Sequence, residues 1–205
     1  MVTKQRRDVF TFGDFLELVQ EHAKADLLDG RIHMASPESI ANNDLVGWLY
    51  ELFAGYVRER RVGHVTVNRV AFRLSHANAP EPDVAFVAAA RTGIMRNGYV
   101  DGPPDLAVEV VSPESVERDY ELKRTKYEEG GVLEYWIIDP EQQRATFLVR
   151  DRAADGSLLP FREASIDAGV YHSQTLPGFR LRVEMLWQKP LPSAYRVIGE
   201  LLGAS

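Results

Sequence analysis

The sequence predicts a mixed α+β fold in which helices flank a central sheet of mixed strand direction. Apolar residues recur at helical spacing up to about residue 59, and from Gly63 onwards they follow the two-residue alternation of strands. One helical segment interrupts the strands, but helices and strands do not alternate regularly. This order argues against a doubly wound parallel sheet.

Length and composition predict a single domain over residues 1–205. The chain has 45% apolar and 26% charged residues, which is typical of a globular protein, and it contains no cysteine. It has no internal repeat and no long linker. Within the domain we expect helices and a hairpin in residues 1–62, a core in residues 63–150, and further strands in residues 151–205.

Charge and hydropathy restrict the partners and the compartment. A formal net charge of −6 argues against a protein that coats nucleic acid non-specifically, although it permits a local basic groove. The chain has no run of about 18 apolar residues, and residues 1–15 have no apolar stretch of signal-peptide length. We therefore expect a cytoplasmic protein without a membrane span.

The amino-terminal third predicts two helices separated by a hairpin. A short amphipathic helix follows a possible N-cap at Thr11 or Asp14. Asp29-Gly30 lies between two apolar runs, which is a hairpin signal. Pro37 then precedes a longer helix over roughly residues 38–59.

The remaining sequence predicts mostly strands. Strand-like runs read HVTVNRVAFRL, PDVAFVAA, DLAVEVV, EYWIID and ATFLVR. A helix within them is expected to open at Ser112-Pro113 and to end at Gly130-Gly131. Residues 151–165 predict a loop or wide hairpin, and YHSQTLPGFRLRVEML predicts further short strands around a turn at Pro177-Gly178.

A search for common catalytic motifs leaves carboxylates as the main candidates. The chain has no Gly-rich phosphate loop, no HExxH, no GxSxG elbow and no zinc-ligand spacing, so we expect no organic cofactor. Its histidines occur singly, at positions His22, His33, His64, His76 and His172. Isolated histidines of this kind are more often surface or structural residues than ligands.

Glu109 lies in the middle of the apolar run PPDLAVEVVSP. Two-residue alternation places it on one strand face with Ala107 and Val111, and neither face looks solvated. A buried ionised carboxylate costs several kcal/mol unless it is paired, hydrogen-bonded or coordinated to a cation. Glu109 therefore marks a cation site, a structural ion pair, or an edge position in contact with water.

Asp83 repeats this pattern at the start of another apolar strand, directly after Pro82. Neighbouring strands bring facing side chains within about 5 Å, and two carboxylates at that distance require a cation between them. Oxygen ligands of this kind suit Mg²⁺ or Mn²⁺. A turn or cap after the proline is the alternative role for Asp83.

Lys123 lies on the predicted helix that follows Glu109. It shares an apolar stripe with Val116, Tyr120 and Tyr127, so the pattern directs it towards the core. A lysine there either extends to water along its methylene stem or meets a buried carboxylate. Lys126 is the neighbouring rival for the same role.

The order of these segments resembles a known family. EPDVAFV, PDLAVEVVSPES, DYELKRTKYEEGGVLEYWIIDP and SQTLPGFRLRV occur in the order found in the Uma-two family, a branch of the PD-(D/E)XK nuclease superfamily. The resemblance implies a restriction-endonuclease-like core and Mg²⁺-dependent hydrolysis of DNA phosphodiesters. It also implies that Asp83 and Glu109 bind the metal, with the backbone carbonyl of Val110 as a further ligand.

Some positions depart from the family pattern. The superfamily lysine normally stands two residues after the second acid, where this chain has Val111, and the Uma-two lysine on the following helix aligns with Lys123. Asp26 stands in place of a family Glu and offers a shorter carboxylate to the metal. Asn42 stands in place of a family His, so this chain lacks whatever that His contributes.

The resulting expectation is a metal-dependent endonuclease that acts on DNA as a symmetric homodimer. Lys123 would orient or activate the attacking water and stabilise the pentavalent phosphorus. Basic residues would grip the DNA backbone, with candidates at Arg69, Arg73, Arg124 and Lys126. The alternatives are a catalytically inactive DNA-binding or protein-interaction module and a hydrolase of another phosphate ester.

Overall fold

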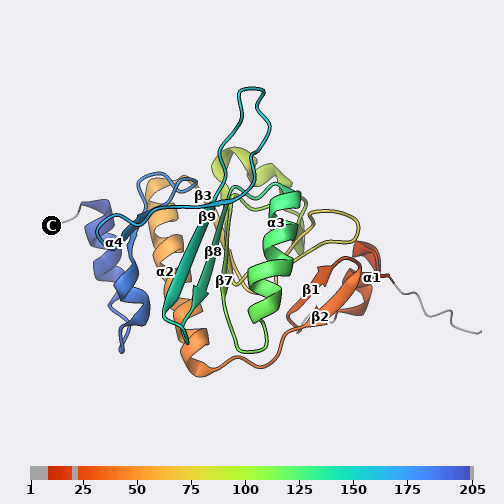
Figure 1. Ribbon diagram of the computed structural model, residues 1–205, viewed down its shortest axis with the longest axis horizontal. Coiled ribbons are helices and arrows are strands. Elements are labelled where there is room, and N and C mark those ends of the chain that lie inside the picture. The colour runs from red at the N-terminus through yellow and green to blue at the C-terminus, as the bar shows by residue number, and fades with distance from the viewer. Residues whose placement is uncertain (1–8, 20–22, 204–205) are drawn as a thin grey trace, which may run out of the picture.

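The computed structural model describes residues 9–19 and 23–203, built around a six-stranded sheet (Figure 1). The strand order is β10-β9-β8-β7-β5-β3, in which β7 and β8 are parallel and all other neighbours are antiparallel. The strands span β3 (Gly63–Val67), β5 (Val84–Ala88), β7 (Leu106–Val110), β8 (Glu134–Asp139), β9 (Arg144–Val149) and β10 (Arg162–Glu163). The predicted α+β class with a mixed central sheet is confirmed.

Helices cover both faces of this sheet (Figure 1). The long helix α2 (Ile40–Arg60) packs on one face, and α3 (Arg124–Gly130) packs on the other. The other helical segments are α1 (Phe12–Leu18), α4 (Ala194–Leu202), the 3-10 turns η1 (Ala89–Ile94) and η3 (Val183–Trp187), and the π-helical η2 (Arg118–Lys123). Within the described residues, no helix has the length and apolarity needed to cross a membrane.

Strand alternation builds a separate core on each face. On the α2 face, Trp136 of β8 packs edge-on against Phe53 with ring centroids 5.1 Å apart. On the α3 face, Tyr135 packs against Tyr127 at 4.8 Å. Each aromatic ring removes roughly 150–250 Å² from water, so the sheet is held firmly between its two helical layers.

A small hairpin lies beside the sheet on the α3 side (Figure 1). Strands β1 (Ala25–Leu28) and β2 (Arg31–Met34) form it around the predicted Asp29-Gly30 turn. Leu27 and Ala79 exchange two backbone hydrogen bonds of 3.1 and 2.7 Å, which fix the hairpin to the chain entering β5. The other short strands are β4 (Ala71–Phe72), β6 (Tyr99–Val100), β11 (Val170–His172) and β12 (Arg180–Arg182).

Two sequence predictions about helices were wrong. The helix after β7 does not open at Ser112-Pro113, because helical structure begins at residue 116, beyond a turn. Val116 is 45% exposed and does not face the core, since the π-helical η2 turns less per residue than an α-helix and so shifts the helical register between Val116 and Lys123. The carboxy-terminal helix α4 was not predicted, although its buried residues follow helical spacing at Ala194, Val197 and Leu201.

Candidate active site

Asp83 and Glu109 meet at one end of the central sheet. The antiparallel register of β5 and β7 pairs Val84 with Val108, so continuing it by one residue places Asp83 opposite Glu109. Both acids are 2% exposed. Asp83 Oδ2 accepts a 2.7 Å hydrogen bond from the N–H of Val110, which fixes that carboxylate against the neighbouring strand.

Lys123 meets carboxylates and does not extend to water. Its Nζ lies 2.9 Å from Glu109 Oε1, 3.1 Å from Asp26 Oδ2 and 3.7 Å from Asp119 Oδ1, and the residue is 2% exposed. The hydroxyl of Tyr127 donates a second hydrogen bond of 2.7 Å to Glu109 Oε1. The structure thus brings together all three residues predicted to be catalytic.

The π-helical segment η2 carries both Asp119 and Lys123 into this site. They stand at its second and last positions, and both are buried. The two residues are four positions apart, a spacing that places both side chains on the same face of the helix. Ser115 donates to Asp119 Oδ2 and holds the acid in place.

The β1–β2 hairpin supplies Asp26. Its Oδ1 accepts a 2.8 Å hydrogen bond from the N–H of Glu81, while Glu81 Oε2 accepts a 3.1 Å bond from the N–H of Ala25. Burial alone would raise the pKa of Asp26, but the nearby Lys123 and the backbone hydrogen bond lower it below its usual value. Burial raises the pKa of Glu81 to about 7. Asp26 is therefore a fixed anion at the site.

Lys24 is a further member of the site that the sequence did not identify. Its Nζ forms an ion pair with Asp83 Oδ1 and lies 3.6 Å from Glu38 Oε1. Lys24 directly precedes β1, where a single charged residue normally faces solvent and attracts no notice. Asp119 was also missed, because the helical pattern assigned it no special position.

Acidic residues outnumber basic ones in the lining of the site, with Asp26, Glu38, Asp83, Glu109 and Asp119 against Lys24, Arg118 and Lys123. Burial raises the pKa of Glu109 to about 8; Lys123 opposes this shift, whereas Asp83 and Asp119 add to it. Asp119 Oδ1 is buried and accepts no hydrogen bond, and burial raises the pKa of that carboxyl as well. Such a site favours the entry of another cation.

Donor chemistry and space fit a small divalent cation. Asp83, Glu109 and Val110 line a cavity of about 30 Å³, close to the volume of one water molecule. Carboxylate and carbonyl oxygens are the ligands that Mg²⁺ and Mn²⁺ prefer. As the side chains stand, no group of three or more His, Cys, Asp or Glu residues in the described ranges 9–19 and 23–203 is arranged to hold a metal, and Lys24 occupies Asp83 Oδ1.

The departures from the family pattern have clear structural settings. Val111 is 2% exposed and packs in the apolar cluster with Tyr127 and Tyr135. A lysine at position 111 would have to enter that apolar cluster. Asn42 of α2 donates a 3.1 Å hydrogen bond from Nδ2 to the carbonyl oxygen of Val111. Asn42 therefore supports the chain just beyond Glu109.

The predicted DNA contacts lie in different surroundings. Arg69 lines an outer cavity of about 590 Å³ that also includes Lys24. Arg73 Nε donates a 2.9 Å hydrogen bond to Asp101, and Lys126 Nζ lies 2.8 Å from Asp29. Arg124 is exposed on α3. Their role as DNA contacts stays a prediction.

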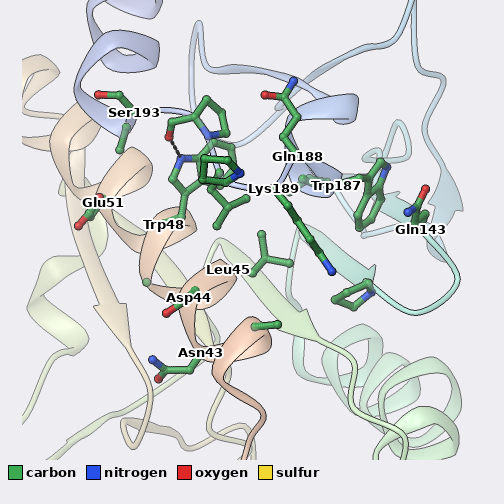
Figure 2. Close-up of a pocket in the computed structure, with 18 of the residues that line it drawn as sticks. Asn43, Asp44, Leu45, Trp48, Glu51, Gln143, Trp187, Gln188, Lys189 and Ser193 are labelled. Atoms are coloured by element: carbon green, nitrogen blue, oxygen red, sulfur yellow. Dashed lines mark hydrogen bonds between the residues drawn. The ribbon is translucent and has the colours of Figure 1, made fainter.

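A larger cavity lies apart from these carboxylates. It measures about 930 Å³ and is lined by residues of α2, η3 and the chain leading to α4, including Trp48, Trp187 and Lys189 (Figure 2). Trp48 Nε1 donates a 2.7 Å hydrogen bond to the carbonyl of Pro192 at its edge. This large cavity shares no lining residue with the carboxylate cavity. The candidate chemistry therefore lies in the smaller site.

Comparison with solved structures supports the same fold class. The chain is similar to the crystal structure of a putative nuclease belonging to DUF820 from Anabaena variabilis, with a TM-score of 0.67 and 16% sequence identity. The similarity covers 87% of this chain and 97% of that one. A comparison with curated proteins found no match.

A family model assigns the chain more specifically. The model described as "Uma2: Putative restriction endonuclease" matches residues 12–184. This range contains the sheet, the hairpin and every carboxylate and lysine of the candidate site. The chain belongs to the Uma2 family, as the resemblance in its motifs predicted.

Proposed function

We propose that this protein is a metal-dependent endonuclease that hydrolyses DNA phosphodiester bonds. The observation that carries the proposal is the pairing of Asp83 and Glu109 across β5 and β7, with Lys123 in contact with Glu109. Membership of a family described as restriction endonucleases supports a nuclease function. Together they favour phosphodiester hydrolysis over other reactions of buried carboxylates.

Asp83, Glu109 and the carbonyl of Val110 would hold Mg²⁺ or Mn²⁺, with Asp26 as a further carboxylate. The bound cation would polarise a phosphoryl oxygen and lower the pKa of a bound water. Hydrolysis then forms a bond between a water oxygen and phosphorus and breaks one ester bond, so the water loses a proton and the leaving oxygen gains one. Lys123 keeps Glu109 and Asp26 in place for this chemistry.

DNA is the proposed partner, bound by its backbone phosphates through Arg69, Arg73, Arg124 and Lys126. A symmetric homodimer would place two such sites on opposite strands of a duplex. Sedimentation equilibrium at micromolar protein checks this assembly. We expect about twice the chain mass of 23.1 kDa, and a single-chain mass at all concentrations would contradict it.

A catalytically inactive nuclease-like module is the second candidate. The ion pair between Lys24 and Asp83 favours this candidate, because Lys24 occupies a carboxylate oxygen that a metal ion would need as a ligand. The net charge of −6 favours the protein-interaction form of this candidate, since an acidic body binds DNA less readily. This candidate predicts DNA or protein binding without cleavage.

Cleavage assays separate the two candidates. Purified protein is incubated with supercoiled plasmid and with single-stranded DNA, in Mg²⁺, in Mn²⁺ and in EDTA. We expect metal-dependent cleavage that falls by at least about 10²-fold in Glu109→Gln, which keeps the side-chain shape but removes the charge.

The exposed Glu141 gives a matched control, because Glu141→Gln makes the same chemical change outside the site. It should cleave like the wild type. Wild-type activity no higher than that of Glu109→Gln, in either metal and on either DNA, would contradict the nuclease proposal.

A further inference from the structure

The two lysines of the site differ in their access to a substrate. Lys123 Nζ is surrounded by Asp26, Glu109 and Asp119, and its side chain is 2% exposed. The side chain of Lys24 is 18% exposed. A side chain that contacts a phosphate arriving from solution must be accessible to solvent. Lys24 meets this condition better than Lys123, because a larger fraction of its side chain is exposed.

Lys24 stands where two cavities join. The inner cavity of about 30 Å³ holds the carboxylates, and the outer cavity of about 590 Å³ extends over Arg69. Both are lined by Lys24, Ala35, Ser36 and Glu38. Lys123 lines the inner cavity and is not part of the outer lining. A phosphodiester that enters through the outer cavity meets Lys24 before it meets the acids.

Lys24 contacts acids of both the inner and the outer cavity. Its Nζ pairs with Asp83 inside the site and lies 3.6 Å from Glu38, whose side chain is 28% exposed at the outer end. Among the residues that the structure describes, the charged ones that line the outer cavity are Lys24, Arg69 and Glu38, and their formal charges sum to a positive value. The inner cavity is rich in carboxylates instead, which repel a phosphate that no cation screens.

We propose that Lys24 is the side chain that contacts the scissile phosphate, and that Lys123 acts as a positioning residue through Glu109 and Asp26. Lys24 donates from Nζ to a non-bridging phosphate oxygen at the junction of the two cavities. This inference rests on the proposed nuclease function and reassigns to Lys24 the phosphate contact that the sequence suggested for Lys123.

Single-turnover cleavage of a DNA duplex in Mn²⁺ tests the assignment with Lys24→Met and Lys24→Arg. Loss of a group that stabilises charge on the reacting phosphate slows the chemical step by about 10²–10³-fold. We expect that loss for Lys24→Met at saturating DNA, with KM much less affected, and partial recovery in Lys24→Arg. Lys189→Met is the matched control, since Lys189 lies in the separate large cavity (Figure 2) and should leave the rate unchanged.

Lysine acetylation read by mass spectrometry gives an independent measurement. Duplex DNA is added together with Ca²⁺, which binds oxygen ligands such as the site's carboxylates. The DNA should slow the acetylation of Lys24 in the wild type at least about threefold, while the acetylation of Lys189 stays constant. A structural ion pair with Asp83 alone would give no such protection by DNA.

The outcomes distinguish the two proposals. If the wild type cleaves and Lys24→Met cleaves equally fast, or if DNA leaves Lys24 labelling unchanged, the assignment of Lys24 is overturned and the nuclease function stands. If the wild type cleaves DNA no faster than Glu109→Gln, the nuclease proposal fails and the assignment of Lys24 fails with it.

Discussion

Lys123 is the central cation of the buried cluster. Its Nζ lies within 3.7 Å of carboxylate oxygens from Asp26, Glu109 and Asp119. Burial alone would lower its pKa, but these carboxylates raise it above the usual lysine value. The lysine therefore remains charged, and the acids around it depend on that charge.

Lys123→Met should destabilise the fold strongly. Removing one partner of a buried ion pair leaves uncompensated charge and costs about 3–5 kcal/mol in the free energy of unfolding. Urea denaturation at neutral pH measures the change, with Lys189→Met at an exposed position as the control. A loss below about 1 kcal/mol would mean that the three carboxylates do not depend on Lys123.

The sequence identified those residues of the site that place a charge within an apolar periodicity, and it did not identify the charged residues that lie outside one. Glu109 and Lys123 were visible because each places a charge in an apolar periodicity. Lys24 precedes a strand and Asp119 lies in a polar stretch of helix, so neither contrasts with its neighbours. Their roles depend on where the hairpin and η2 pack against the sheet, through Lys24 with Asp83 and Lys123 with Glu109, and local periodicity does not encode this packing.

Strand β8 carries a buried acid outside the candidate site, Glu134, which has a structural role. Glu134 is fully buried on the α2 face and accepts six hydrogen bonds from the segment around β11 and from β8 itself. The donors are Trp136 Nε1, the Tyr171 hydroxyl, the Ser173 and Thr175 hydroxyls, and the N–H groups of Gln174 and Thr175, at 2.7–3.0 Å. Glu134 thus fastens residues 171–175 to the sheet.

Glu134→Ala should lower the free energy of unfolding by at least about 3 kcal/mol, because it leaves several buried donors without an acceptor. Denaturation by urea gives the value. Glu141→Ala, at an exposed position of the following turn, should stay within about 0.5 kcal/mol of the wild type. Equal stability of the two variants would contradict a structural role for Glu134.

The β1–β2 hairpin and η2 show why element boundaries were harder to predict than element types. The hairpin turn at Asp29-Gly30 has a strong local signal, and the structure forms it there. The π segment has no such local signal, because π-helices are rare and occur mostly as single-turn bulges inside α-helices. Predictions from regular helical spacing consequently placed Val116 in the core.

For the whole molecule, the sequence predicted the class of fold, a mixed central sheet flanked by helices. Alternation in β7 predicted that Leu106, Val108 and Val110 face one side and Glu109 the other, and the two apolar cores confirm it. The strand order could not be predicted, since pairings such as that of β3 with β5 depend on contacts between distant segments that a single sequence does not reveal. The large cavity beside α4 was missed together with that helix.

A titration with Mn²⁺ followed by electron paramagnetic resonance tests the carboxylate cluster most directly. Asp83→Asn keeps the hydrogen-bond acceptor for Val110 but removes one of the charges proposed to hold the cation. The wild type and Glu141→Gln should bind Mn²⁺ at Asp83 and Glu109, and Asp83→Asn should bind it at least about tenfold more weakly. Two results would contradict a divalent-cation site at this end of the sheet. One is that the wild type binds no Mn²⁺ even at millimolar concentrations of the ion, and the other is that Asp83→Asn binds Mn²⁺ as tightly as the wild type.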